Sequence, residues 1–232
     1  MLTTIILTFN EEQHIARAVE SVRDVCDRFL VVDSGSTDRT CEIARELGCE
    51  VLTNPWVNYA MQFNWALEKL GDLDTWILRL DADEYVTPKL ASELMQHLNA
   101  LDDRVDGVFV SRRMTFLRRP IRHGGVFPVH VLRLFRLGKG RCENRWMDEH
   151  IKVSGRTEKF DGELIDDNVN SLSWWTQKHN SYASREVIDL LNLEFGFMPH
   201  DTVADLAGGQ QAGVKRWIKE NLYPLFPKWR RF

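Results

Sequence analysis

Residues 76–85, WILRLDADEY, join a continuous apolar run to three carboxylates within four positions, Asp81, Asp83 and Glu84. An apolar run without polar alternation predicts a strand that is buried on both faces, as the strands of parallel sheets are. Carboxylates on a surface turn would be ordinary, but carboxylates at the mouth of a parallel sheet usually have a partner. The stretch therefore predicts both a parallel sheet and a binding site at the end of one of its strands.

Three further apolar runs precede this stretch, and segments of helical length separate them. Strand and helix alternating at this spacing are typical of β-α-β units. We expect Ser36 and Thr37 to cap the second helix and Gly48 to end it. Thr87 is expected to cap a fourth helix over 88–98. The predicted strands are 4–9, 29–33, 50–54 and 75–81, and the predicted helices between them are 11–25, 38–47 and 59–70.

The second half of the chain has a different pattern. The segments DGVFVSRRMTFL (106–117), HVLRLFRL (130–137) and HIKVSG (150–155) predict strands joined by loops that contain Gly and Arg. The segment DGELIDDN (161–168) is expected to be an acidic loop, followed by a long helix over 172–194. We therefore predict an α/β fold, with a mostly parallel central sheet flanked by helices and a helical C-terminal appendage.

Composition excludes several classes of protein. The chain has 232 residues and a formal net charge of −4, which argues against general nucleic-acid binding. Its four cysteines form no C-x-x-C pair, so we expect neither a zinc site nor a disulfide framework, and reduced thiols indicate the cytoplasm. The first residues do not resemble a signal peptide. No window approaches the roughly 20 apolar residues of a membrane span.

Polar side chains follow three of the four predicted strands. Ligands of open α/β sheets bind outside the carboxyl ends of the strands, so we expect these side chains to share one crevice. Neither a Gly-x-Gly-x-x-Gly nor a P-loop pattern follows the first strand, so a nucleotide would have to be held differently. The side chains are Asn10 and Glu11 after the first strand, Asp33 after the second, and Asp81 and Asp83 after the fourth.

The pair Asp81 and Asp83 suggests a metal site. The two residues lie two apart in an extended segment, so both side chains can point the same way. Mg²⁺ is usually bound by one or two carboxylates together with substrate phosphates. A metal in this place would neutralise charge that develops on a leaving diphosphate. The alternative is an acidic turn before the helix that starts at Pro88.

With these motifs in view, the sequence resembles the family 2 glycosyltransferases of the GT-A fold. The resemblance covers most of the chain and rests on five motifs in the family's order and at its usual spacing. Within the family the chain looks most similar to bacterial enzymes that extend lipopolysaccharide cores or exopolysaccharide units. The motifs are LTFNEE (7–12), VVDSGSTDRT (31–40), QFNWAL (62–67), LRLDADE (78–84) and RWMDEH (145–150).

The resemblance implies a site for a UDP-sugar donor. At the matching positions, Phe9 would stack on the uracil, Glu11 would contact the ribose, and Asp33 would hydrogen-bond the base. Thr8 and Asn64 complete the implied nucleotide-sugar site.

The resemblance also implies metal-assisted transfer with inversion. Asp83 would ligate Mn²⁺ or Mg²⁺ on the diphosphate, and Asp81 would face the ribose and the metal. Inversion needs a carboxylate within reach of the attacking acceptor hydroxyl, to take its proton. The motif RWMDEH implies that Glu149, in preference to Asp148, is this base, with His150 on the acceptor side in a position to orient it. The alternative is that the two acids cap a turn and the His is structural.

Two basic segments bear on the acceptor. RRMTFLRRPIRH (112–123) contains five arginines and no acid, and guanidinium forks suit phosphate or carboxylate groups. One hypothesis is that Arg118 and Arg119 grip an anionic acceptor, such as a phosphorylated core or a lipid diphosphate; a solvated loop is the alternative. The basic, aromatic tail 214–232 has a helical apolar spacing typical of docking on an anionic membrane surface, with packing on the body as its alternative.

These expectations combine into one predicted function. The chain would move a sugar, a hexose such as glucose, from a UDP-sugar to a saccharide or lipid-linked saccharide acceptor in lipopolysaccharide or exopolysaccharide biosynthesis. Residues 1–170 would be the catalytic domain, with a nucleotide-binding half (1–98) and an acceptor half (99–170), and 171–232 a helical region peripheral to the inner membrane's cytoplasmic face. Two alternative functions are open. A sugar-phosphate nucleotidyltransferase would be expected to carry a Gly-rich loop with Lys or Arg after the first strand, whereas TFNEE (8–12) is acidic and has no Gly. A non-catalytic nucleotide-binding protein would tolerate loss of Glu149.

Overall fold

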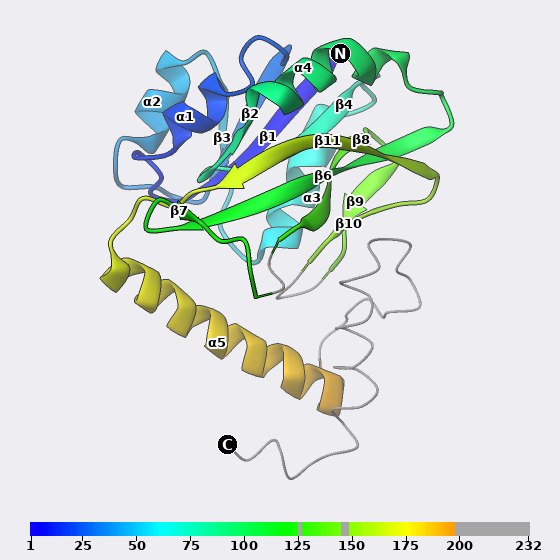
Figure 1. Ribbon diagram of the computed structural model, residues 1–232. Helices are drawn as coiled ribbons and strands as arrows, with labels where there is room; N and C mark the ends of the chain where they lie inside the picture. Colours follow the sequence, from blue (N-terminus) through cyan, green and yellow to red (C-terminus); the bar gives the residue numbers. More distant parts are fainter. Residues whose placement is uncertain (125–126, 145–148, 198–232) are drawn as a thin grey trace.

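The computed structural model describes residues 1–124, 127–144 and 149–197 (Figure 1). Within these ranges a nine-stranded sheet has the order β3-β2-β1-β4-β8-β6-β11-β5, with β7 paired to β6, and a second sheet consists of β10 and β9. The elements are β1 (Leu2–Thr8), α1 (Ile15–Glu20), β2 (Arg28–Asp33), α2 (Thr40–Glu46), β3 (Glu50–Thr53), α3 (Tyr59–Leu70), β4 (Trp76–Asp81), β5 (Glu84–Val86), α4 (Pro88–His97), the 3₁₀ turn η1 (Leu98–Ala100), β6 (Val105–Phe116), β7 (Arg119–Pro120), β8 (Val129–Arg136), β9 (Gly140–Cys142), β10 (Ile151–Val153), β11 (Arg156–Asp166) and α5 (Leu172–Phe195).

The first half of the chain forms the predicted parallel sheet. β1 lies between β2 and β4, β3 lies beside β2, and all three pairings are parallel. Helices α3 and α4 follow the predicted bounds closely. The Thr87 side chain caps α4 by accepting a hydrogen bond from the backbone N–H of Leu90. Gly48 follows α2 with a φ of +81°, a backbone conformation that glycine adopts at low cost.

The first two helices are shorter than predicted, and the predicted caps of the second helix are wrong. α1 begins only at Ile15 and α2 only at Thr40. Ser36 and Thr37 are not available as caps because they bond to the ends of the neighbouring strands, Ser36 to Asp33 and Thr37 to the Asn10 side chain. The residues before each helix therefore form a loop network in place of a first helical turn.

The second half adds antiparallel strands and one long strand that the sequence did not reveal. β8 pairs antiparallel with both β4 and β6, whereas β11 runs parallel to β6 and pairs antiparallel with β5. The expectation of an acidic loop over 161–168 is wrong for its first six residues, which belong to β11. Its acids are neutralised across the sheet, since Arg113 lies 3.0 Å from Glu163 and Arg112 lies 3.1 Å from Asp166.

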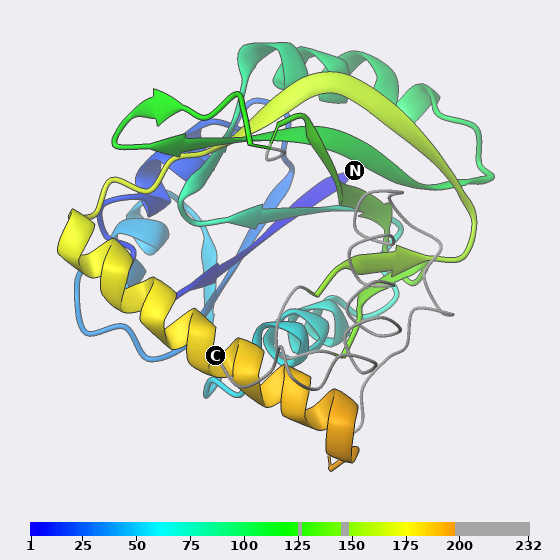
Figure 2. The same cartoon turned by 60° about the horizontal axis from the view of Figure 1, so that its bottom comes forward.

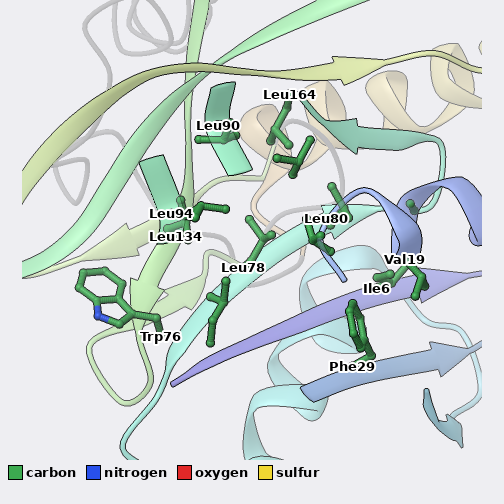
Figure 3. Packing of buried hydrophobic residues seen from close by; sticks show 14 of the residues in the cluster. Ile6, Val19, Phe29, Trp76, Leu78, Leu80, Leu90, Leu94, Leu134 and Leu164 are labelled. Atoms are coloured by element: carbon green, nitrogen blue, oxygen red, sulfur yellow. The ribbon is translucent and has the colours of Figure 1, made fainter. Parts of the chain in front are cut away.

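The sheet separates two layers of hydrophobic core. The side chains of β4 alternate between these layers, and this alternation decides on which face its charged side chains lie. Leu78 and Leu80 lie in the cluster beneath α1, α2 and α4 (Figure 3), whereas Ile77 lies in the cluster beneath α3. Successive side chains of a strand point to opposite faces, so Arg79 and Asp81 continue the row of Ile77. The polar end of β4 is thereby directed toward the start of α3.

Helix α5 lies apart from both layers. Figures 1 and 2 show it running across the end of the sheet at which β1 finishes. The Ser171 side chain caps it by accepting a hydrogen bond from the backbone N–H of Trp174, as the predicted long helix requires. Within the described ranges, no helix has the length and apolar character needed to cross a bilayer. The tail 214–232, and with it the membrane-docking hypothesis, lies outside the described residues.

The packing of α4 on β11 gives a stability prediction. A Cβ at Gly162 would lie 2.4 Å from Leu90 Cα, a backbone atom that can move only with its helix. We expect Gly162→Ala to destabilise the protein by about 1–3 kcal/mol through overpacking, as measured by urea unfolding. Asp161→Ala, at the exposed neighbouring position, is the matched control. Equal unfolding midpoints for the two variants would contradict the close approach.

Candidate active site

A cleft of about 1080 Å³ opens at the carboxyl ends of β1 and β4. Its walls come from these two strands, from β6 and β8, from the β6–β7 hairpin and from α5. Among the predicted site residues described by the structure, seven line this cleft and four do not. Lining residues are Thr8, Phe9, Glu11, Asp81, Asp83, Glu149 and His150; those outside it are Asp33, Asn64, Arg118 and Arg119. Asp148 lies outside the described residues.

Asp33, at the end of β2, is only 2% exposed. Its carboxylate accepts hydrogen bonds from the Thr8 hydroxyl, the Gly35 N–H and both the N–H and the hydroxyl of Ser36. Burial acts to raise the pKa of Asp33, but these donors outweigh it and lower the pKa below its usual value. Asp33 thus fixes the loop that follows β2, and its expected contact with a base stays a prediction.

Glu11 is held from behind by a buried histidine. Glu11 Oε2 lies 2.7 Å from His14 Nδ1, while His14 Nε2 lies 3.0 Å from the backbone nitrogen of Val169. Because that N–H donates to Nε2, a neutral His14 must carry its proton on Nδ1 and donate it to Glu11. Within the described residues, the other Glu11 oxygen has no such hydrogen bond and remains available at the cleft.

The end of β4 is a compact network of charges. Asp81 accepts hydrogen bonds from the Tyr59 hydroxyl at one oxygen and from Arg133 Nη2, at 3.0 Å, at the other. Arg133 also lies 2.5 Å from Glu84 Oε1, and Arg79 Nε lies 3.0 Å from the Tyr59 oxygen. Burial acts to raise the pKa of Asp81, but the Arg133 and Arg79 guanidinium groups hold it well below its ordinary range. Asp81 is therefore a fixed anion at neutral pH.

Asp83 faces another part of the cleft and has a second carboxylate near it. Asp83 Oδ2 accepts a hydrogen bond from Asn168 Nδ2 at 3.0 Å. Burial and the neighbouring Asp83 charge raise the pKa of Asp166 to about 6, against the effect of Arg112. Two carboxylates that disfavour each other's charge fit a divalent cation. In the described part of the chain, no group of three or more His, Cys, Asp or Glu is placed so that it could hold a metal ion by itself, so substrate oxygens would have to complete such a site.

Glu149 lines the same cleft and contacts β4 through Arg79. Its Oε1 accepts a hydrogen bond from Arg79 Nη2 at 3.3 Å, and 13% of its side chain is exposed. Burial raises the pKa of Glu149, while the Arg79 charge opposes part of that rise. A carboxylate with a raised pKa takes up a proton more readily at neutral pH, which is the property a general base needs.

Asn64 and His150 hold the segment that carries Glu149. The Asn64 side chain bonds to both the C=O and the N–H of Cys142, at 2.8 and 2.9 Å, so Asn64 ties α3 to β9 and does not reach the cleft. The backbone N–H of His150 donates to Glu143 Oε1 at 2.7 Å, and its ring Nδ1 lies 3.2 Å from the same oxygen. These bonds give Asn64 a supporting role, and its expected place near the donor stays a prediction.

The arginine-rich segment is divided between two environments. Arg112 and Arg113 pair with acids of β11, as described above. Arg118 and Arg119 are exposed on the β6–β7 hairpin and do not line the cleft, although the hairpin's Leu117 does. Leu117 and Arg118 have φ values of +50° and +61°, the left-handed pair of a two-residue hairpin turn. Their acceptor role stays a hypothesis.

An aromatic row on α5 forms the remaining wall. The Trp175 ring stacks on His179 with centroids 3.7 Å apart, and its edge meets Phe116 of the hairpin at 5.3 Å. His179 in turn contacts the Tyr182 ring. All four side chains line the cleft. Helix and hairpin therefore enclose it together.

Sequence reasoning missed Tyr59, Arg79 and Arg133, which all line the cleft. One signal was present for two of them, because Arg79 and Arg133 are lone cations within apolar strands, where a buried charge needs a partner. Tyr59 carried no such signal, since it meets its partners only through the fold. Lys178 also lines the cleft; it stands in SWWTQKHNSYASRE (173–186), a segment that resembles a family signature but to which the sequence assigned no chemistry.

Residues 3–158 match the family described as Glycosyl transferase family 2. The chain belongs to this family. Membership confirms the predicted recognition, and with the sheet topology described above it confirms the GT-A fold.

Named relatives agree with this assignment. A lipopolysaccharide core biosynthesis glycosyltransferase, LpsC of Rhizobium meliloti, is 34% identical over 147 residues, covering 61% of this chain and 53% of LpsC. An uncharacterized glycosyltransferase of Rickettsia typhi is 41% identical over 93 residues, covering 40% of this chain and 31% of the relative. The chain thus spans about a third to a half of these relatives' length. Among solved structures, S. aureus TarS 1-349 in complex with UDP-GlcNAc matches with 22% identity and a TM-score of 0.42, covering 53% of this chain and 37% of TarS.

The contact between Arg79 and Glu149 gives a prediction about this family member. Arg79→Gln removes the cation that favours ionised Glu149, so we expect the Glu149 pKa, already above its ordinary value, to rise further. Carbon-13 NMR titration of labelled glutamate carboxyl groups measures it. Lys89→Met, which removes an exposed cation on α4, should leave it unchanged. A lower pKa in Arg79→Gln would mean that Arg79 does not act on Glu149.

Proposed function

We propose that the chain is an inverting glycosyltransferase that moves a sugar from a UDP-sugar to a saccharide acceptor during assembly of lipopolysaccharide or exopolysaccharide. One observation carries the proposal. The fixed anion Asp81, the acidic pair of Asp83 and Asp166, and the raised-pKa carboxylate Glu149 line a single cleft. Family membership gives this arrangement its chemical context.

The donor would lie along the ends of β1 and β4. Phe9 is 57% exposed at the cleft, which leaves its ring available for stacking on a base. The available oxygen of Glu11 suits a ribose hydroxyl, and His14 keeps that carboxylate in place. Asp33 would act here by fixing the loop on which the nucleotide rests, in addition to any contact of its own.

A divalent cation, Mn²⁺ or Mg²⁺, fits the oxygen donors on the diphosphate side. Asp83 would hold it, with Asp166 next to Asp83, and Asp81 would set the charge behind them. When bound, the cation would supply charge neutralisation for the departing nucleoside diphosphate.

Glu149 would be the general base. It would accept the proton of the acceptor hydroxyl as the acceptor oxygen bonds to the anomeric carbon on the face opposite the diphosphate. Arg79 favours the ionised form of this carboxylate against the effect of its burial, and the bonds of Asn64 and Glu143 hold the segment from which it projects. Asp148 is the adjacent candidate in sequence.

Metal-dependent nucleotide binding is the first test. We expect UDP with Mn²⁺ to bind measurably by calorimetry, and EDTA or Asp83→Asn to weaken that binding by about tenfold or more, since each removes a charge-assisted contact. Asp72→Asn, on an exposed turn, is the matched control. If neither EDTA nor Asp83→Asn changed the affinity for UDP, the proposed metal site would be wrong. A panel of UDP-sugars in the same assay would point to the donor.

Transfer itself tests the base. We expect Glu149→Gln to slow transfer by about 10²–10⁴-fold, the usual contribution of general-base catalysis, with UDP affinity unchanged. Transfer is measured from labelled UDP-sugars to lipopolysaccharide core oligosaccharides. Glu68→Gln, exposed on α3, is the control. Full activity in Glu149→Gln together with loss in Asp148→Asn would assign the role to Asp148. If the protein bound UDP but no transfer activity depended on Glu149 or Asp148, it would be a non-catalytic nucleotide-binding protein.

A further inference from the structure

Helix α5 brings a cation to the diphosphate end of the cleft. Lys178 Nζ lies 3.8 Å from Asp83 Oδ2, and its side chain is 31% exposed. The ammonium group lies 4.7 Å from the centre of the Trp174 ring and 5.9 Å from that of Tyr182. Cation–π contacts with two rings restrict a side chain that is otherwise flexible. Lys178 is therefore directed into the cleft beside the proposed metal ligand.

Lys178 differs from most other cations of the cleft lining. Arg79, Arg112, Arg133 and Lys152 each lie between 2.5 and 3.5 Å from a carboxylate oxygen. The Lys178 distance of 3.8 Å is longer than a direct hydrogen bond. Among the described lining residues, Arg185 is the other Lys or Arg without a close carboxylate, and it lies two helical turns farther along α5.

The position of Asp83 also argues against a purely structural ion pair. Asn168 Nδ2 already donates to the same Asp83 oxygen at 3.0 Å, so that carboxylate is held in place without Lys178. An ammonium group offers three N–H donors and carries no acceptor, which suits phosphate oxygens. A diphosphate bound beside Asp83 would meet this group directly.

We propose that Lys178 binds the diphosphate of the donor and stabilises it as a leaving group. This inference rests on the proposed function. During transfer, the bond between the acceptor oxygen and the anomeric carbon forms while the bond from that carbon to the diphosphate oxygen breaks. The electron pair leaves with the nucleoside diphosphate, where the Lys178 ammonium neutralises it, and the acceptor proton goes to Glu149. Lys178 keeps its own proton throughout, acting as a fixed cation aimed at developing negative charge.

A comparison of UDP with uridine tests this role, because only UDP carries the diphosphate. We expect Lys178→Met to weaken UDP binding by about tenfold or more with Mn²⁺ present, the size of one charge-assisted hydrogen bond, and to leave uridine binding unchanged. UDP is measured by calorimetry and uridine by NMR titration, which suits weak ligands. Lys178→Arg keeps the charge and should retain most of the UDP affinity. Lys89→Met, with the same change of net charge on exposed α4, should bind both ligands as the unmodified protein does.

Three results would overturn the inference. Unchanged UDP affinity in Lys178→Met would show that the ammonium does not contact the diphosphate. Metal-dependent UDP binding by the unmodified protein would, in that case, still support the proposed function. Equal weakening of UDP and uridine would assign Lys178 a structural role in placing α5. Absence of UDP binding by the unmodified protein would remove the proposed function and this inference together.

Discussion

The pairing of buried charges at the end of β4 is the constraint on which the site depends. Arg79 and Asp81 project from the same face of a buried strand, where an unpaired charge would be costly. Their partners come from elements far apart in the chain, so the charges can be satisfied only when α3, β8 and the segment carrying Glu149 are all in place. Folding of the sheet and assembly of the cleft are therefore one event. The partners are Tyr59, Arg133 and Glu149.

The same network separates the carboxylates by their affinity for protons. Asp81 lies between two guanidinium groups and remains ionised, whereas burial dominates at Glu149 and its pKa rises. Burial and the Asp83 charge also raise the pKa of Asp166, to about 6. Environments that push titratable groups apart assign them different tasks. Here they separate Asp81, a fixed anion, from Asp166 and Glu149, whose pKa values are raised, within one cleft.

The sequence was enough to predict those strands and helices whose apolar pattern lies within the element itself. The parallel strands and α3 were predicted from apolar runs, and Asp81, Asp83 and Glu149 do line one cleft. β11 was missed because its acids are neutralised by Arg112 and Arg113 on a strand about fifty residues earlier, and such cross-strand pairs are invisible before register is known. Asp33 and Asn64 do not line the cleft, because both bond to backbone groups that their motifs do not show: Asp33 to the loop after β2 and Asn64 to Cys142. Their donor contacts stay predictions.

The contact of His14 with Val169 has a consequence for movement. It joins the loop after β1, which carries Glu11, to the segment between β11 and α5, and Arg17 adds a second strut through Asp167. These bonds couple the two segments. We therefore expect a displacement of the start of α5 to be transmitted to Glu11, at the end of the cleft where β1 finishes.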